Sequence, residues 1–268
     1  MLLTNISTDS ISTANIHQIG HGVEIQVSMP RPLKYRAGQF VFLSIPRLAA
    51  FQSHPFQIAW EYLGEGGCQV IVFVVQPRHG FTSRLRLAAP MRDYAALVEG
   101  PYGRSIATEQ YGTVLLFATG IGIAGQLPYM KEQLHLYREW RTQTRRHVLF
   151  WEMDAEEYRY WVNEWINEIL SWNIAYEIHL YIRGHFLTED AEAGVSVKKG
   201  EKLLRLTLNY FPMEPENLIR SEIQKRGDRG RMLVSLCTDS STSRVVSKAI
   251  APIIGKDVDL VELDFCPW

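Results

Sequence analysis

The sequence predicts two domains, a small antiparallel β-barrel followed by a doubly wound parallel-sheet domain. Up to about residue 110, short β-branched and aromatic runs are separated by Gly and Pro, as in a small barrel. After Gly112, strand-like and helix-like segments alternate, which is typical of a parallel sheet with helices on both faces. The 268 residues suffice for two medium domains, which we place at residues 1–108 and 109–268.

The elements of the first domain follow from alternation and composition. Val23, Ile25 and Val27 alternate with polar neighbours, which predicts a strand with one buried face. β-branched and aromatic runs bounded by Gly and Pro predict further strands at residues 40–45 and 68–75. One short helix is expected at residues 82–87.

The second domain begins with a continuous apolar run at residues 113–118, as expected of a strand buried on both faces. A helix to about Trp140 follows, and then strands at residues 147–152, 174–182, 232–237 and 258–263 and helices at 155–170 and 242–250. Residues 183–229 are less regular. We expect a mobile acidic loop there, followed by a helix near residues 215–225.

Composition excludes several classes of protein. Lys and Arg number 28 and Asp and Glu number 29, a balance that argues against nucleic acid or an anionic membrane as the main partner. Arg141, Arg145 and Arg146 form a small basic run, which is either a solvated helix end or a phosphate site.

Cysteine and histidine patterns predict no metal site and a reducing compartment, because the three Cys lack C-x-x-C spacing and no H-E-x-x-H occurs. The first 15 residues lack the charged and apolar regions of a signal peptide. The longest mostly apolar run, residues 114–129, is short and contains three glycines, so no membrane span is expected and the chain alone is expected to be soluble and cytoplasmic.

A glycine-rich turn at residues 120–125, G-I-G-I-A-G, follows a predicted strand and precedes a helix. Glycines let the backbone approach a phosphate, and the helix N-terminus offers free N–H groups. The same glycines also suit an ordinary tight turn with close helix packing. No Asp or Glu follows at the distance where a dinucleotide fold holds a ribose, so the fingerprint is incomplete.

Four further segments carry possible chemistry. His54-Pro55-Phe56-Gln57 lies on a predicted strand, where His54 could equally be a hydrogen-bonded structural residue and Phe56 part of the core. In the segment from His79 to Leu85, Thr82 or Ser83 opens a helix, either as an N-cap or as part of an anion site.

Cys237-Thr238-Asp239 ends a predicted buried strand. A buried Cys is usually a small core residue, but the carboxyl ends of strands are where open α/β sheets bind ligands. The chain ends in Asp264-Phe265-Cys266-Pro267-Trp268, whose aromatic residues are expected to dock on a flat or apolar surface.

Taken in order, these segments resemble the ferredoxin-reductase-type flavoprotein module of fungal ferric reductases and NADPH oxidases, over nearly the whole chain. The matching elements are R-A-G-Q-F at residues 36–40, H-P-F at 54–56, G-F-T at 80–82, E-G-P-Y-G at 99–103, T-G-I-G-I at 119–123, Cys237 and the aromatic tail.

The resemblance implies an FAD-binding barrel at residues 1–108 and an NAD(P)-binding domain at 109–268. It implies that FAD is held by His54, Pro55, Phe56, Gln57, Gly80, Phe81, Thr82 and Ser83. It implies that NADPH is held by Thr119, Gly120, Gly122, Ile123, Cys237 and Thr238. The residues implied in catalysis are Cys237 beside the nicotinamide and Phe265 and Trp268, which cover the flavin ring and move aside for hydride transfer.

The sequence also departs from the family pattern. Gln57 stands where the family has Thr or Ser near the flavin, and Thr119 and Ile121 replace a Gly and a Thr of the nucleotide loop. Thr238 and Asp239 replace the Gly and Pro that follow the family's Cys, and Phe211 lies where an Arg is common. The departures concentrate in the nucleotide-binding half.

The family's activity implies a flavoprotein reductase that takes a hydride from NADPH to FAD and passes single electrons to haem or ferric iron. The implied partner is a haem-bearing membrane domain or a ferric chelate, with this module on the cytosolic face of the membrane. Two alternatives remain: an inactive module that binds flavin or a partner, and a free-standing soluble flavin reductase.

Overall fold

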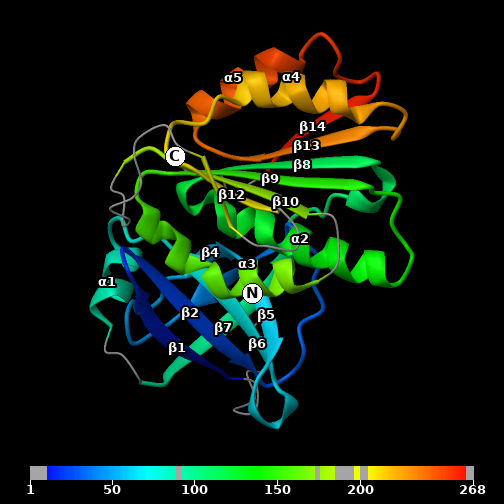
Figure 1. The fold of residues 1–268 in the computed structure, drawn as a ribbon. Coiled ribbons are helices and arrows are strands. Elements are labelled where there is room, and N and C mark those ends of the chain that lie inside the picture. The colour runs from blue at the N-terminus through cyan, green and yellow to red at the C-terminus, as the bar shows by residue number, and fades with distance from the viewer. Residues whose placement is uncertain (1–10, 89–91, 173–175, 185–195, 200–204, 264–268) are drawn as a thin grey trace. The chain divides into compact units, whose positions relative to one another are not determined.

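A computed structural model describes residues 11–88, 92–172, 176–184, 196–199 and 205–263, and its chain divides into two compact units, Met1–Ser105 and Ile106–Trp268. Each unit contains one seven-stranded sheet (Figure 1). The units are described separately below. The assignment of a different cofactor to each unit stays a prediction at this point.

The first unit is an antiparallel sheet with strand order β4-β3-β7-β1-β2-β6-β5. Its strands are β1 Ser12–Ile19, β2 Gly22–Met29, β3 Phe40–Ser44, β4 His54–Gln57, β5 Trp60–Leu63, β6 Gln69–Val75 and β7 Tyr94–Tyr102, with the 3-10 turn η2 Glu65–Gly67 after β5 and helix α1 Phe81–Leu87 after β6.

One apolar core holds the first unit together. Val23, Ile25 and Val27 of β2 are fully buried, while the residues between them are half-buried, so the predicted alternation is confirmed. Helix α1 buries Phe81 and Leu85 in the same core, to which the other strands also contribute. Because the strands enclose one shared core, the predicted small antiparallel barrel is confirmed.

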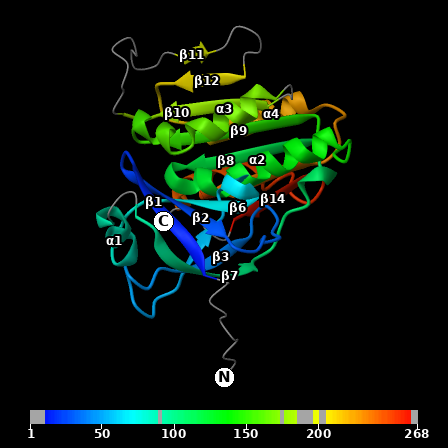
Figure 2. The ribbon, with the colours of Figure 1, turned by 90° about the horizontal axis from the view of Figure 1, so that it is seen from below.

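The second unit is a parallel sheet with one antiparallel edge strand, in the order β11-β12-β10-β9-β8-β13-β14 (Figure 2). Its strands are β8 Thr113–Thr119, β9 Arg146–Met153, β10 Tyr176–Ile182, β11 Ser196–Lys199, β12 Leu206–Asn209, β13 Met232–Cys237 and β14 Val258–Glu262. Its helices are α2 Ile123–Arg138, α3 Asn163–Ser171, α4 Pro215–Arg226 and α5 Ser240–Ile250, and its 3-10 turns are η3 Thr108–Gln110, η4 Gly120–Gly122 and η5 Glu156–Trp161.

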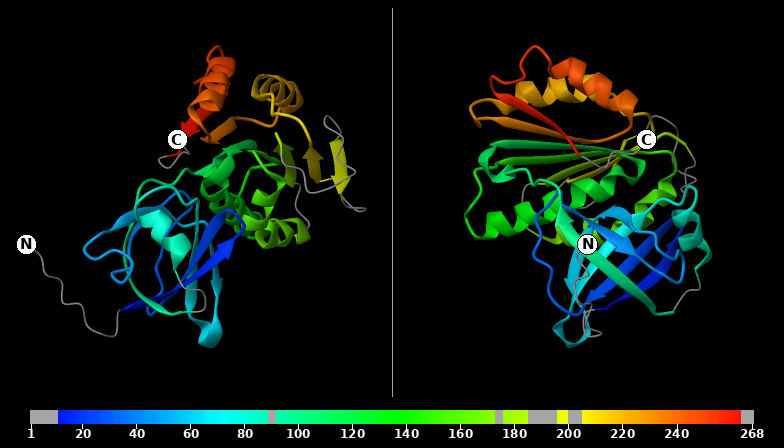
Figure 3. Two further views of the ribbon diagram at one scale, coloured as in Figure 1. Left: turned by 90° about the vertical axis from the view of Figure 1, so that its left-hand side faces the viewer. Right: turned by 180° about the vertical axis from the view of Figure 1, so that it is seen from behind.

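The helices cover both faces of this sheet. Helices α2 and α3 lie on one face and α4 and α5 on the other (Figure 3). All seven residues of β8 are buried, as its continuous apolar run predicts. The doubly wound parallel sheet is therefore confirmed.

Two predictions within this unit were wrong in detail. The helix expected at residues 155–170 is interrupted at Val162, whose φ of −141° and ψ of 9° separate η5 from α3. Buried Trp161 stacks on Tyr158 at 4.3 Å, while α3 buries a separate stripe that begins at Trp165. The non-helical backbone at Val162 therefore divides the segment into a 3-10 turn and a shorter α-helix.

The expected long loop at residues 183–229 is also interrupted by structure. Strands β11 and β12 form an antiparallel pair within it, and β12 adds to the sheet beside β10. The helix expected near residues 215–225 is confirmed as α4. Four-residue strands give too short a pattern to detect in the sequence, and residues 185–195 and 200–204 lie outside the described part of the chain.

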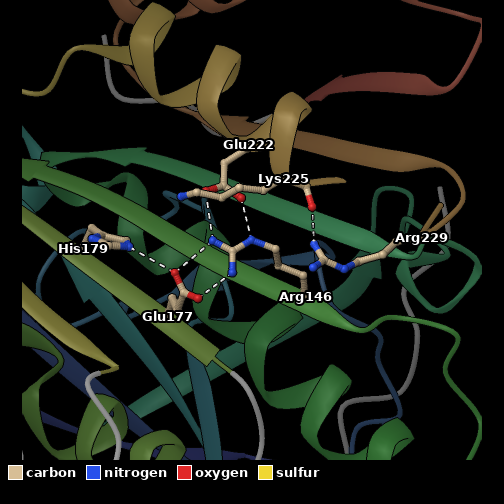
Figure 4. A network of polar contacts seen from close by, with 6 residues as sticks. All are labelled: Arg146, Glu177, His179, Glu222, Lys225 and Arg229. Atoms are coloured by element: carbon tan, nitrogen blue, oxygen red, sulfur yellow. Dashed lines mark hydrogen bonds and ion pairs between the residues drawn. The ribbon is translucent and has the colours of Figure 1, made fainter. Parts of the chain in front are cut away.

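The basic run divides: Arg141 and Arg145 are exposed after the end of α2, as a solvated helix end predicts, whereas Arg146 is not. Arg141 is exposed and pairs with Glu139, but Arg146 is the first residue of β9 and only 14% of its side chain is exposed. Its guanidinium donates to Glu177 of β10 at 2.5 and 2.9 Å and to Glu222 of α4 at 2.6 and 2.9 Å (Figure 4). Arg146 therefore ties α4 to the sheet.

The charges of this network are mutually dependent. Burial alone would raise the pKa of Glu222, but the hydrogen bonds from Arg146 and Lys225 outweigh burial and lower it. The ring of His179, whose Nε2 lies 3.6 Å from Glu177 Oε2, and the guanidinium of Arg146 lower the pKa of Glu177 to about 2. Both carboxyls are thus ionised at neutral pH.

Replacing Arg146 by Met leaves the carboxylate of Glu222, which is 3% exposed, without its principal partner. We expect a loss of about 3–5 kcal/mol in the free energy of unfolding, measured by urea denaturation at pH 7. The double variant Arg146→Met/Glu222→Met should recover most of it, because no buried charge remains unpaired.

The stabilisation by the Arg146 network depends on pH with a defined sign. The folded pKa values of both carboxyls lie below their unfolded value of about 4.3. Their pairing therefore stabilises fully above that pH and is lost as the pH falls toward about 2. A difference between wild type and Arg146→Met that stays constant from pH 7 to pH 3 would contradict this account.

Candidate functional site

Strand β4 carries the His-Pro-Phe segment and places it beside helix α1. The ring of His54 stacks on Phe81 with centroids 4.4 Å apart and an interplanar angle of 13°. Phe56 lies 6.1 Å from Phe81 and 6.0 Å from Phe73 of β6. His54 and Phe56 are both half-buried. The two segments that the sequence singled out in this unit therefore meet at the first residue of α1.

The turn before α1 requires glycine. Gly80 has a φ of +65° and is the N-cap residue of the helix, so neither Thr82 nor Ser83 is the cap. Thr82 Oγ1 instead accepts from the backbone N–H of Arg78 at 2.9 Å and donates to His79 O at 3.2 Å, and Ser83 Oγ donates to Gly80 O at 2.8 Å. Both hydroxyls are half-buried at the start of the helix.

Gln57 ends β4 with an unsatisfied amide. Its Nε2 is buried and finds no acceptor among the described residues. A buried donor without a partner costs about 1–3 kcal/mol, so an acceptor from a bound molecule would be favourable here. This orphaned amide is an observation on the first unit that fits a ligand with hydrogen-bond acceptors.

In the second unit, the carboxyl ends of the six parallel strands meet at one edge of the sheet. The glycine-rich turn follows β8 there. Gly120 has a φ of +49°, and a Cβ on it would meet no atom within 4 Å. Its carbonyl accepts from Trp151 Nε1 at 2.9 Å, which fixes the turn against β9. The backbone at Gly120 is thus held in place with open space above it, as a phosphate needs.

Cys237 ends the neighbouring strand β13 and is fully buried. A Cβ on Gly125 of α2 would lie 2.8 Å from its Sγ, so the thiol packs directly on that glycine. The structure thus gives Gly125 a packing role and puts the thiol in the core. Contact between Cys237 and a nicotinamide stays a prediction.

Thr238 and Asp239 follow at the same edge. Thr238 is 1% exposed, and its Oγ1 has no hydrogen-bond partner among the described residues. The backbone N–H of Asp239 donates to Thr119 Oγ1 at 2.7 Å, which joins the loop after β13 to the end of β8. Thr119 and Thr238, both expected near NADPH, therefore lie on adjacent strand ends.

Asp239 occupies the N-terminus of α5. Its Oδ1 accepts from the backbone N–H groups of Ser241 at 2.9 Å and Thr242 at 3.0 Å. Burial alone would raise the pKa of Asp239, but the hydrogen bonds from Ser241 and Thr242 outweigh burial and lower it. A carboxylate thus caps the helix at a position where the family pattern has an uncharged residue.

Charged groups that no sequence motif indicated lie at the end of β9. Glu152 pairs in register with Thr119, is 6% exposed and accepts from the backbone N–H of Met213 at 2.6 Å. Burial is the main cause that raises its pKa. Arg183, directly after β10, donates to Asp154 at 2.5 and 3.0 Å and lies 3.6 Å from Glu152. Their position at strand carboxyl ends was the signal that could have identified them.

The remaining expected residues are placed as follows. Phe211, which stands where the family has an Arg, packs edge-on against Tyr181 at 5.9 Å and joins the core. Phe265 and Trp268 lie outside the described residues.

Among the residues that the structure describes, no three His, Cys, Asp or Glu side chains gather as a metal site would require. In the described ranges, no helix is long and apolar enough to cross a membrane.

Comparison with known proteins gives a family match to one part of the chain and sequence relatives for about half of it. Residues 8–106 match the model of a family described as an FAD-binding domain. The chain is 28% identical over 153 residues to a probable cell surface ferric reductase of Aspergillus oryzae, and 29% identical over 137 residues to a respiratory burst oxidase homologue of Solanum tuberosum. These matches cover 52% and 43% of the chain but only 20% and 16% of the two relatives.

Solved structures share the fold. A cytochrome P450 reductase of Amycolatopsis superposes with a TM-score of 0.60 at 13% identity, covering 96% of this chain and 69% of its own. A ferredoxin NADP+ reductase of Neisseria gonorrhoeae, solved with FAD and NADP, gives 0.59 at 12% identity, covering 94% and 98%.

The described fold, an antiparallel barrel followed by a doubly wound parallel sheet, is shared with solved reductases of the ferredoxin-reductase type. Together with the sequence relatives, this shared fold supports the resemblance of the chain to the FAD- and NAD(P)-binding modules of the ferric reductase and NADPH oxidase family. The resemblance inferred from the motifs is thereby confirmed. The chain spans about a fifth of the length of the ferric reductases it matches.

The cap at Asp239 is testable on its own. Replacing Asp239 by Ala should lower the free energy of unfolding by about 1 kcal/mol at pH 7, because two backbone N–H groups of α5 lose their acceptor. Asp239→Asn should retain most of the stability, because Asn caps as well as Asp. Urea denaturation followed by circular dichroism provides the measurement.

The stabilities of the Asp239→Ala and Asp239→Asn variants should also depend differently on pH. Since the folded pKa of Asp239 is lowered, its advantage over Ala is present above the unfolded pKa of about 3.9 and is lost as the pH falls through the folded value. The Asn variant should not show this loss. Equal destabilisation by Ala and Asn at pH 7 would show that the side chain is not acting as a cap.

Proposed function

We propose that this chain is the electron-input module of a flavoprotein reductase, which takes a hydride from NADPH to FAD and passes single electrons to a haem or ferric acceptor. When bound, FAD supplies the conversion between a two-electron donor and a one-electron acceptor. The observation that carries the proposal is the meeting of the His-Pro-Phe strand with the start of α1, inside the region matching an FAD-binding domain.

The residues of the first unit fit FAD. His54 and the hydroxyls of Thr82 and Ser83 lie around the glycine turn before α1. They would hold the pyrophosphate once the two hydroxyls turn away from the backbone carbonyls to which they donate here. Phe56 offers an aromatic face beside them for the ring system. The orphaned Nε2 of Gln57 would donate to a ring acceptor, in place of the Thr or Ser common at this position.

The residues of the second unit fit a pyridine nucleotide in part. The open space over Gly120 and the helix N-terminus that follows Gly122 would receive phosphate. The buried, unpartnered Oγ1 of Thr238 would hydrogen-bond a nicotinamide amide near Cys237. Thr119 would hold the two strand ends in register through its bond to Asp239.

The partner we propose is a haem-bearing membrane domain, in the same polypeptide or a separate one, with this module at the cytosolic face. Relatives named as transmembrane components of ferric reductases support this assignment. Ferric chelate is the alternative acceptor. Its direct reduction by the isolated chain would favour a free-standing reductase.

A second candidate is a module that binds flavin without turnover. Two observations favour it. The carboxylate of Asp239 caps α5 at the sheet edge proposed to bind the nucleotide, and the thiol of Cys237 is buried against Gly125. Either feature would weaken nucleotide binding without affecting the first unit. The two candidates therefore agree on FAD and differ on NADPH.

The FAD assignment is tested by the double variant His54→Ala/Thr82→Ala. A hydrogen bond to a charged group contributes about 1.5–3 kcal/mol, so each loss should raise the Kd for FAD by roughly tenfold to a hundredfold. Flavin content after gel filtration and titration of the apoprotein with FAD provide the measurement. The matched control is His17→Ala/Thr13→Ala on β1, which should retain flavin. Stoichiometric FAD in the His54/Thr82 variant would contradict the assignment.

A further inference from the structure

The near-zero net charge of the chain conceals a division between its units. The first unit, Met1–Ser105, carries nine Lys and Arg and six Asp and Glu, whereas the second carries 19 and 23. The net charges are therefore +3 and −4, which together give the −1 of the whole chain. The whole-chain balance thus cannot exclude an anionic partner for the first unit.

The excess positive charge gathers in two neighbouring segments of that unit. Residues 45–60 and residues 66–92 contain no Asp or Glu. Within them, the loop between β3 and β4 lies against helix α1, because Arg84 Nη1 donates to Leu48 O at 3.0 Å. Leu48 also packs on the core to which α1 contributes Phe81 and Leu85.

Core packing decides what this surface presents to solvent. Since α1 turns Phe81 and Leu85 into the core, Arg84, Arg86 and Leu87 are left exposed. The adjacent loop exposes Arg47 and Phe51. We call these five residues, Arg47, Phe51, Arg84, Arg86 and Leu87, the cationic patch.

The two apolar members of the patch are unusually exposed. Phe51 is 106% exposed and Leu87 is 85% exposed. The backbone of Phe51 has a φ of +60°, a conformation that is unfavourable for a bulky residue. The fold therefore holds a large aromatic side chain in solvent, on a strained backbone, in the loop to which Arg84 donates.

We propose that the cationic patch binds an anionic lipid bilayer surface, with guanidinium groups on lipid phosphates and Phe51 and Leu87 inserted beneath the headgroups. Guanidinium matches phosphate geometry, and protruding apolar residues among cations are typical of proteins that lie on membranes. Lipid is favoured over a protein partner because Phe51 and Leu87 protrude almost fully into solvent. The proposal concerns no residue assigned above to a cofactor, and it does not depend on electron transfer.

The test is binding of the FAD-loaded chain to vesicles of phosphatidylcholine, either pure or mixed with phosphatidylserine in about a 2:1 ratio. Co-sedimentation should detect binding to the mixed vesicles only, and added salt should weaken it. Because each cation near an anionic surface changes partitioning by roughly fivefold, Arg47→Gln/Arg86→Gln should reduce it by about 25-fold. Phe51→Ser/Leu87→Ser should also reduce binding to the mixed vesicles.

The matched control is Arg244→Gln/Lys248→Gln, which removes two exposed charges from α5 of the second unit. It should bind the mixed vesicles as the wild type does, and flavin content should be unchanged in every variant. Equal binding to pure phosphatidylcholine, no binding to either vesicle, or an equal loss in the control would overturn the proposal. Absence of vesicle binding combined with reduced electron transfer from the patch variants to a haem-bearing membrane protein would assign the patch to a protein partner instead.

Discussion

The second unit depends on the complete burial of β8. Because all seven of its residues are buried, the strand must have a neighbour on each side and helices on each face. Parallel pairing with β9 and β13 satisfies this requirement and brings three carboxyl ends to one edge. Polar groups at those ends then interact: Asp239 N–H donates to Thr119, and Glu152 lies in register with the same threonine. The sheet edge proposed to bind the nucleotide, at the carboxyl ends of these strands, is thus a consequence of how the core is built.

In the first unit, the packing of helix α1 in the core positions the proposed flavin residues. A barrel of short strands leaves its core open at one end, and helix α1 inserts Phe81 and Leu85 there. The same insertion brings the glycine turn before α1 beside β4, so that His54 stacks on Phe81. Core packing therefore brings the proposed flavin residues together at the start of α1 and leaves Arg84, Arg86 and Leu87 of the same helix exposed.

Local patterns in the sequence predicted most of the fold. Alternation in β2, the apolar run of β8 and the glycine turn before α2 each involve neighbouring residues, and each was confirmed. The break at Val162 and the pairing of β11 with β12 depend on contacts between distant residues, so local patterns could not show them. The basic run illustrates the same limit, because the partners of Arg146 are 31 and 76 residues away.

The candidate site, like the fold, has features that the sequence predicted and features that depend on contacts between distant residues. Motif order predicted which segments carry the chemistry, and the structure brings His54 to α1 and Thr119 to Thr238. Burial of Cys237 against Gly125, and the position of Glu152 opposite Thr119, depend on how strands and helices pack together. Whether NADPH binds depends on these packed contacts, because they lie at the edge proposed to receive it.

We propose that this chain alone can move electrons from NADPH to FAD. An absorbance spectrum of the purified chain with FAD, recorded anaerobically before and after addition of NADPH, tests it most directly. The account predicts a visible flavin band that bleaches when NADPH is added. A band that persists while FAD remains bound would contradict the account and leave a flavin-binding module without turnover.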